Sequence, residues 1–252
     1  MSTSPAETAG QAAPRRALIA PLWHTILFVL FIVGYALFGG TRVSRLENAH
    51  LTTRVPLYLF MLGFELVLFS YVWFLGVKPA GGSIRELVGG EWKTVRDFLK
   101  DVGIAFMFWL VVITVLVGLR LTIGQNPDAL RAAQVLAPQS GLEFLLWVVV
   151  AFSAGTCEEF VFRGYLQRQF FALTGSDAAA VILQAVVFGA AHSYQGVRGM
   201  VTIGIYGGLF GVLAVNRRSL RPGMIQHFMQ DSFAGLAAGL LRHFGKLPAG
   251  LF

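Results

Sequence analysis

The stretch Phe144–Arg163 reads FLLWVVVAFSAGTCEEFVFR, and it decides the fold. Its apolar run, residues 144–162, shows no alternation of apolar and polar residues, which favours a helix over a strand. A helix of about 20 residues spans the hydrocarbon core of a bilayer. Because lipid offers the backbone no hydrogen-bond partners, only helices and closed barrels cross it. The stretch therefore predicts a membrane helix that carries two adjacent glutamates near its end.

Six further apolar runs of this kind lie along the chain, at residues 18–38, 55–77, 102–123, 178–191, 201–215 and 224–241. Together with residues 144–162, they predict an all-α polytopic membrane protein, a bundle of about seven to eight transmembrane helices. The eighth would be a loop that re-enters the membrane. In the polar connection at residues 78–101, apolar residues recur at helical intervals, which predicts an amphipathic helix on the membrane surface.

The composition agrees with this fold class and excludes several others. The chain has 252 residues, of which 56% are hydrophobic and only 13% are charged, and its mean hydropathy is +0.66. A soluble domain carries about 25% charged residues, so soluble, disordered and nucleic-acid-binding chains are excluded. The net charge of +7 suits an anionic lipid surface. The single cysteine, Cys157, excludes a disulfide framework and a cysteine-rich metal site.

The chain divides into a short tail and one membrane domain. Residues 1–17 are small and polar and predict a disordered N-terminal tail, and residues 18–252 predict a single membrane-embedded domain. With seven spans, twelve of the 20 Lys and Arg residues fall on the side of the N-terminus. The positive-inside rule then places the N-terminus in the cytoplasm, as expected for the cytoplasmic (inner) membrane of a bacterium.

Glycines recur at four-residue intervals in the last two apolar runs. The pairs are Gly204/Gly208, Gly207/Gly211 and Gly235/Gly239. Such pairs allow helix backbones to approach closely. We expect them to serve packing within the chain rather than dimerisation.

Ionisable residues inside the apolar runs are the strongest functional signal. They belong to the fourth, fifth and seventh predicted helices: Glu158, Glu159 and Arg163, then His192, then His227 and Asp231. Ionisable residues within membrane spans are costly and by default indicate function. Glu159 and Arg163 are four residues apart and can pair on one helix face, which leaves Glu158 without a partner. His227 and Asp231 lie one helical turn apart on a common face.

The spacing around Gly175 indicates that two of these side chains lie at the same height. Glu158 precedes Gly175 by 175 − 158 = 17 residues, and His192 follows it by 192 − 175 = 17 residues. If the two helices form an antiparallel hairpin, Glu158 and His192 are level. Pro222 suits the first turn of a helix, which puts His227 about 7.5 Å along the axis. The sequence therefore predicts one site at shallow depth, facing the cytoplasm.

The order of these motifs resembles the CPBP family, which contains type II CAAX prenyl endopeptidases and bacteriocin-processing intramembrane proteases. The matching residues are Glu158-Glu159 with Arg163, Phe188 with His192, and His227 with Asp231. The resemblance covers about residues 140–242 and leaves the first three apolar runs untested. At Asp231, the members that cleave CAAX proteins usually have asparagine. The resemblance implies an intramembrane endopeptidase acting on a membrane-associated or prenylated (CAAX-type) protein or peptide.

The resemblance also implies roles for the matching residues. Glu158 would activate a water as general base, and His192 would hold that water with it. His227 and Asp231 would polarise the scissile carbonyl or position the water. Glu159 and Arg163 would fix the helix behind the catalytic residues. The expected partners are membrane lipid and a protein or peptide substrate, with no nucleic acid, and the oligomeric state stays open.

The sequence leaves the metal question open. Glu158, His192, His227 and Asp231 offer nitrogen and oxygen ligands of the kind that hold Zn²⁺ or another divalent metal. The pattern is not the His-Glu-x-x-His motif of zinc proteases. A metal-free activation of water by glutamate and histidine fits these residues equally well.

The same residues are compatible with other functions. A transporter could use the same buried carboxylates and histidines, but it would spread them over both halves of the chain. A non-catalytic immunity or scaffold protein would not need the intact set. Cys157 lies beside two carboxylates that disfavour a thiolate, so it is expected to pack rather than react. Glu65, in the second apolar run, either lines a cavity or bonds to a neighbouring helix, and we favour the second.

Overall fold

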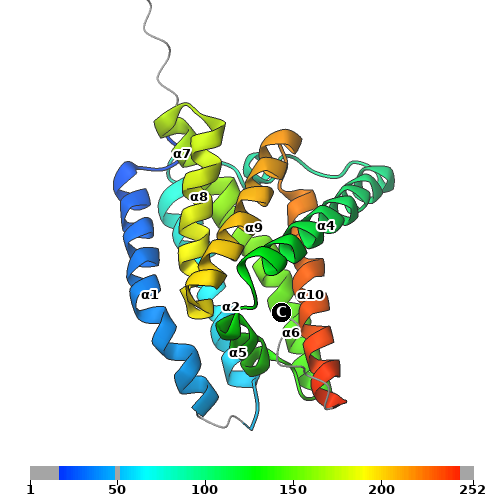
Figure 1. Cartoon of the computed structure of the whole chain (residues 1–252). Helices are drawn as coiled ribbons and strands as arrows, with labels where there is room; N and C mark the ends of the chain where they lie inside the picture. Colours follow the sequence, from blue (N-terminus) through cyan, green and yellow to red (C-terminus); the bar gives the residue numbers. More distant parts are fainter. Residues whose placement is uncertain (1–16, 49–51, 245–252) are drawn as a thin grey trace, which may run out of the picture.

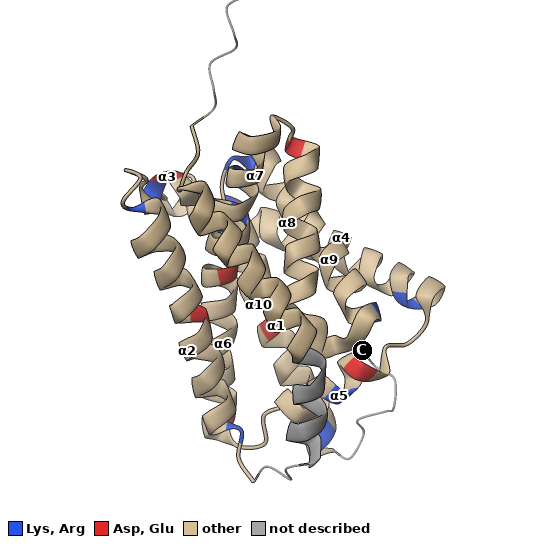
Figure 2. Cartoon of the chain, turned by 90° about the vertical axis from the view of Figure 1, so that its left-hand side faces the viewer, with Lys and Arg blue, Asp and Glu red and all other residues tan. Residues whose placement is uncertain are grey.

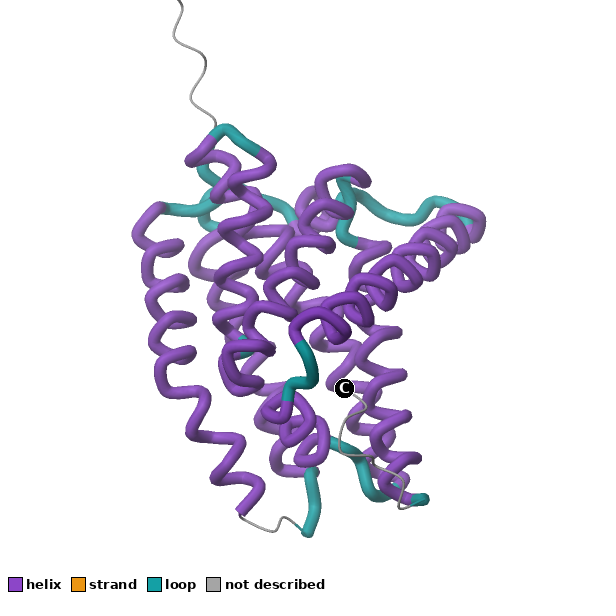
Figure 3. Tube along the Cα trace, in the orientation of Figure 1, coloured by secondary structure: helices purple, strands orange, loops and turns teal. Residues whose placement is uncertain are grey.

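The computed structural model describes residues 17–48 and 52–244, with the backbone alone for residues 39–48. The regular elements in these ranges are all helical, and Figure 3 shows no strand among them. The predicted tail at residues 1–17 lies outside the described residues except for its last residue, Ala17. The all-α fold class is thus confirmed.

Seven long helical units and several short helices make up the bundle (Figure 1). In chain order these are α1 (Leu22–Asn48), α2 (Val55–Ser70) with the π-helical continuation η1 (Tyr71–Val77), α3 (Ile84–Val88), α4 (Val95–Ile123), α5 (Pro127–Leu136), α6 (Gly141–Glu158), the π-helical η2 (Glu159–Leu166), α7 (Gln167–Thr174), α8 (Asp177–Ala191), the 3₁₀ turn η3 (Ser193–Gln195), α9 (Gly196–Arg217) and α10 (Arg221–His243).

In the described chain, six of the seven predicted apolar runs lie wholly in helices, and the first, residues 18–38, begins four residues before α1. Four helical units are long and apolar enough to cross a membrane: Val55–Val77, Val95–Ile123, Gly141–Thr174 and Ser193–Arg217. Leu22–Phe38 and Asp177–Ala191 are apolar but shorter. The seventh run lies in α10, whose first turns carry Gln226, His227, Gln230 and Asp231 and which is therefore more polar than a typical span. Many large apolar side chains are exposed on the bundle, as a lipid-facing surface requires.

The connection at residues 78–101 differs from the prediction of one amphipathic helix. It forms the short α3 and the first turns of α4, separated by Gly89 and Gly90, which have φ values of +89° and +91°. Side-chain-bearing residues rarely adopt this left-handed conformation, so the two glycines end α3. Thr94 then begins α4 with a reciprocal capping box to Asp97.

Helix α5 was not predicted, although the sequence carries its start signal. The side chain of Asn126 accepts from the N–H groups of Asp128 and Ala129, and Pro127 occupies the first helical position. Asparagine followed by proline is a typical helix beginning. The α5 residues Ala132 and Leu136 line both cavities described below, so this missed helix helps to shape the candidate site.

The unit formed by α6, η2 and α7 is the central rod of the bundle, and it packs against α2, α8 and α10. Gly155 allows the backbones of α6 and α10 to touch, since a Cβ there would lie 2.8 Å from the backbone nitrogen of Phe228. On the other side, Gly189 of α8 faces Gly204 of α9. The helix pairs α6/α10 and α8/α9 thus approach each other as closely as small residues allow.

The predicted packing role of the paired glycines is confirmed within the chain. A Cβ on Gly207 would lie 2.6 Å from the Phe188 ring, and one on Gly239 would lie 2.5 Å from the Phe144 ring. A Cβ on Gly235 would lie closer still to the indole of Trp147. Side chains of α6 and α8, within the same bundle, fill the space beside these glycines.

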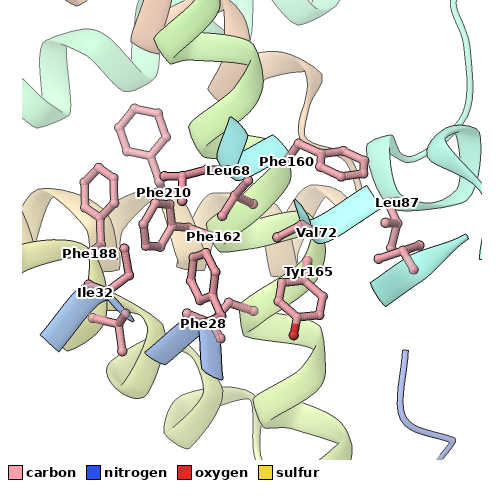
Figure 4. Close-up of a cluster of buried hydrophobic side chains, with 14 of the residues drawn as sticks. Phe28, Ile32, Leu68, Val72, Leu87, Phe160, Phe162, Tyr165, Phe188 and Phe210 are labelled. Carbon is pink, nitrogen blue, oxygen red and sulfur yellow. The ribbon is translucent and has the colours of Figure 1, made fainter. Parts of the chain in front are cut away.

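A cluster of buried aromatic side chains joins α1, η2, α8 and α9 (Figure 4). Phe162 packs edge-on against both Phe28 of α1 and Phe188 of α8, with ring centroids 6.1 and 4.9 Å apart. Edge-to-face packing is a favoured arrangement of aromatic pairs. The cluster fixes the residues that directly follow Glu158 and Glu159 and that precede His192.

Three segments that carry basic residues meet at one end of the bundle: α3, α7 and the connection between α9 and α10. Arg168 of α7 donates to the carbonyls of Glu86 and Leu87 in α3, and the Leu220 N–H donates to the Val88 carbonyl. Figure 2 shows Lys and Arg towards the ends of the bundle and several Asp and Glu positions part-way along its helices. The compartment that this end faces stays a prediction.

Candidate active site

The two glutamates of the decisive stretch lie where the central rod changes from α-helix to π-helix. Glu158 is the last residue of α6, and Glu159 is the first of η2, whose residues are all buried. The wider turn of a π-helix displaces side chains from their α-helical positions, and such segments are frequent at functional sites. Here it turns Glu159 into the protein interior, while Glu158 stays at a cavity wall.

Glu159 and Arg163 form the ion pair that their spacing predicts. Arg163 Nη1 lies 2.9 Å from Glu159 Oε1, and both side chains are almost fully buried. Arg163 Nη2 also donates to the Gly207 carbonyl at 3.1 Å. The guanidinium stacks over the Phe188 and Phe210 rings, with its carbon 4.3 and 5.2 Å from their centroids. Arg163 thereby connects η2 with α8 and α9.

His227 extends this pair towards the catalytic candidates. Its Nδ1 lies 3.1 Å from Glu159 Oε1, so Glu159 orients the ring from behind. On the other side of the ring, Nε2 lies 3.8 Å from Glu158 Oε2 and 3.6 Å from Asp231 Oδ2. The His227 side chain is 5% exposed, whereas those of Glu158 and Asp231 are 21% and 34% exposed. The structure thus brings these predicted residues together, with the two carboxylates on the open side.

His192 lies at the C-terminal end of α8, where its ring turns back onto the helix. Its Nδ1 is 2.9 Å from the Phe188 carbonyl oxygen. Because a carbonyl only accepts, Nδ1 carries the proton, and Nε2 of the neutral ring is left as an acceptor. His192 and Glu158 line the same two cavities, in agreement with their equal spacing from Gly175.

Two cavities meet at the site. The larger, of about 600 Å³, extends between α2, α4, α5, α6, α9 and α10, and its wall includes Glu158, His192, His227 and Asp231. The smaller, of about 180 Å³, lies between α1, α2 and α5 and has mostly apolar walls. Both share the side chains of Glu65, Glu158, His192 and Tyr194. A cavity of this size is in the range of ligand and substrate sites.

Several cavity residues were missed by the sequence analysis. Trp147 donates from its indole N–H to the Asp231 carbonyl at 2.8 Å, and Tyr206 lies over His227 with ring centroids 5.8 Å apart. Aromatic residues in apolar runs give no separate signal. Tyr194 belongs to the 3₁₀ turn η3 that follows His192. Ser193 of this turn is buried and Tyr194 lines both cavities, whereas Val197, just beyond it, is exposed.

Glu65 differs from the interpretation that the sequence favoured. It lines both cavities rather than serving only as a bond to a neighbouring helix. The Ser153 hydroxyl of α6 interacts with its carboxyl group. However, Glu65 Oε2 is buried and has no hydrogen-bond partner in the part of the chain that the structure describes. The only signal in the sequence was a lone acid in an apolar helix.

The side chains as placed do not fit a bound metal. Within the part of the chain that the structure describes, no group of three or more His, Cys, Asp or Glu side chains is arranged to hold a metal ion. The Nδ1 atoms of His227 and His192 are engaged by Glu159 and by the Phe188 carbonyl. We therefore derive no catalytic step that passes through a metal.

The comparison with protein families assigns the segment that carries this site. Residues 140–233 match the family described as type II CAAX prenyl endopeptidase Rce1-like. The match includes Glu158, His192, His227 and Asp231 and confirms the resemblance drawn from their motifs. At the level of the family, it indicates an intramembrane protease of the CAAX type, and the apolar helices agree with an integral membrane protein. No curated protein and no solved structure matches the chain.

Proposed function

We propose that the chain is an intramembrane endopeptidase, because residues 140–233 match the family described as type II CAAX prenyl endopeptidase Rce1-like. It hydrolyses a peptide bond of a membrane-associated or prenylated (CAAX-type) protein or peptide, with a water molecule activated by Glu158. The orientation predicted from the basic residues, with the N-terminus and the active site facing the cytoplasm, is part of this proposal.

One observation carries the proposal. Glu158, His192, His227 and Asp231 come from three helices far apart in the sequence, and all four line one cavity of about 600 Å³. A structural ion pair does not require this convergence, because Glu159 already neutralises Arg163 without the other four residues. Peptide hydrolysis requires a base, a group that stabilises the oxyanion and space for the substrate next to both.

In the proposed reaction, Glu158 removes a proton from a water whose oxygen attacks the scissile carbonyl carbon. His192, whose Nδ1 donates to the Phe188 carbonyl, presents Nε2 to the cavity as an acceptor and helps to hold that water. When the tetrahedral intermediate collapses, the carbon–nitrogen bond breaks, and Glu158 returns its proton to the leaving amine. General acid–base catalysis of this kind contributes about 10²–10⁴-fold to a rate.

His227 is placed to stabilise the oxyanion. Its Nδ1 interacts with Glu159, so Nε2 faces the side of the cavity where Glu158 and Asp231 lie. With a proton on each ring nitrogen, His227 would donate from Nε2 to the oxyanion, and the flanking carboxylates would balance its charge. Asp231 then acts on His227 and on the position of the water rather than on the carbonyl directly.

The test is a comparison of membrane proteomes from cells that carry the wild-type chain or Glu158→Ala. We expect new protein termini that appear only with the wild type, and none with Glu158→Ala or His192→Ala at equal levels of inserted protein. Glu91→Ala, which removes an exposed acid, serves as the control. Equal cleavage by wild type and Glu158→Ala would contradict the proposal and favour a transporter or a non-catalytic partner protein.

A separate measurement addresses the metal. The purified chain is treated with a chelator and then with Zn²⁺, while cleavage of a peptide from one of these sites is followed. The mechanism above predicts no loss of rate with the chelator. Loss of activity that Zn²⁺ restores would show that a metal takes part, and the described side chains would then have to rearrange to bind it.

A further inference from the structure

The proposed protease has a third carboxylate in its cavity that its reaction does not use. Resting on the proposed function, we propose that Glu65 determines specificity by receiving a lysine or arginine side chain of the substrate beside the scissile bond. Glu65 lies in α2, outside the segment that matches the family. The inference therefore concerns this chain in particular and not the shared catalytic motifs.

The first observation is an unsatisfied acceptor. Glu65 is 7% exposed, and its Oε2 is buried without a hydrogen-bond partner among the described residues. An unpaired polar atom in an apolar environment costs free energy, and a charged one costs more. The carboxyl group nevertheless faces open space, because Glu65 lines both cavities at their junction.

The second observation is the excess of acid on the cavity walls. Glu65, Glu158 and Asp231 all contribute to the larger cavity, and Glu65 is close enough to interact electrostatically with the other two and with His227. Among the described residues that line the two cavities, Arg120 is the only lysine or arginine, and it lines only the larger one. The junction of the cavities is therefore complementary to a positive charge.

The third observation is that comparable acids elsewhere in the fold are paired internally. Glu159 has Arg163, and Asp101 of α4 has the indole N–H of Trp92 at 2.8 Å and Arg221 Nε at 3.2 Å. Glu143 has three donors, described below. Glu65 Oε2 is the one acid oxygen in the chain's described part that is recorded as buried and unpartnered. A partner that arrives with the substrate accounts for this difference.

The location limits where that positive charge lies on the substrate. Glu65 shares its walls with Glu158 and His192, which act on the scissile bond. A cation that reaches Glu65 therefore comes from a residue close to that bond. The apolar walls of the smaller cavity, including Leu57, Phe60 and Phe64, suit the aliphatic stem of such a side chain.

The experiment uses the full chain in lipid nanodiscs and a peptide that spans the strongest Glu158-dependent cleavage site. Each of the three residues on either side of the scissile bond is replaced in turn by lysine or by norleucine, which has the stem of lysine but no amine. At one position, we expect kcat/KM to be at least about tenfold higher for lysine, mainly through KM, as for one charge-assisted contact. In Glu65→Gln, the ratio at that position should fall to about one.

Glu143→Gln is the matched control, because it neutralises another buried carboxylate without touching either cavity, and it should keep the ratio. A ratio near one at all six positions in the wild type would overturn the inference, as would a preference that survives Glu65→Gln or is also lost in Glu143→Gln. If Glu65→Gln does not fold, the lysine preference is judged from Glu65→Asp and from the substrate scan of the wild type. Glu158-dependent cleavage without a lysine preference overturns only this inference, whereas absence of Glu158-dependent cleavage overturns the proposed function with it.

Discussion

The molecule holds two groups of acids in its apolar interior, and they differ in how their oxygens are used. Glu143, in the first turn of α6, is 3% exposed. It accepts from the backbone N–H groups of Arg54 and Gln139 at 2.7 and 2.8 Å and from the Thr53 hydroxyl at 2.9 Å. These bonds fix the beginning of α2 to the beginning of α6, so this acid is part of the fold.

The acids that line the cavity instead have carboxylate oxygens that no described donor engages. Glu158 and Asp231 have His227 Nε2 at 3.8 and 3.6 Å, beyond hydrogen-bond distance, and Glu65 Oε2 has no partner. Buried polar groups in folded proteins are nearly always hydrogen-bonded, so exceptions call for an explanation. The comparison teaches that unused acceptor capacity at a cavity wall, and not burial alone, separates acids that react or bind from acids that support the fold.

The largest effect on cleavage is expected for Glu158, one of the acids that line the cavity. Glu158→Gln keeps the size of the side chain but removes its basicity, so kcat should fall by about 10²–10⁴-fold, measured with purified protein on a peptide from a mapped cleavage site. Thermal unfolding in detergent should shift little, because Glu158 holds no part of the fold in place. A variant that keeps more than a tenth of wild-type kcat would contradict the role of Glu158 as base.

Glu159→Gln tests an internally paired acid that also contacts the site through His227. The change leaves the Arg163 guanidinium buried without its charged partner, a situation that costs about 3–5 kcal/mol. We expect a large drop in the unfolding temperature and also slower cleavage, since His227 loses the group that orients it. The double variant Glu159→Gln/Arg163→Met should recover part of the stability but none of the activity. Recovery of both would show that Glu159 serves only to neutralise Arg163.

Glu143→Gln should have the opposite profile from Glu158→Gln. An amide has only one oxygen, so at least one of the three donors around residue 143 loses its acceptor, at a cost of about 1–3 kcal/mol. Thermal unfolding measures this loss, and kcat per folded molecule should stay at the wild-type value. A fall in kcat as large as that of Glu158→Gln would show that the two groups of acids are not functionally distinct.

Much of this arrangement could be predicted from the sequence because it depends on local spacing. Length and hydropathy place the seven long helices, the interval of four residues pairs Glu159 with Arg163, and the equal distances from Gly175 bring Glu158 and His192 to one cavity. Each of these inferences needs only helix geometry and the cost of polar groups in lipid.

The remaining features depend on contacts between distant segments. The role proposed for Glu65 rests on the absence of a donor near Oε2 among the described residues, and no pattern around residue 65 shows which helices surround it. The break between α3 and α4 follows from two glycines with positive φ, and a Cβ on Gly89 would collide with the backbone of Arg218 and Ser219. Periodicity continued across those glycines and therefore predicted one helix.

The smallest effect is expected for an acid that is neither buried nor at the cavity. Glu91 pairs with Arg85 at 2.8 Å, but the two side chains are 56% and 64% exposed. Exposed ion pairs contribute about 0–1 kcal/mol, so Glu91→Gln should change neither thermal unfolding nor cleavage beyond that range. A loss of stability as large as that of Glu143→Gln would show that the number of hydrogen-bond donors around an acid does not determine how much that acid stabilises the fold.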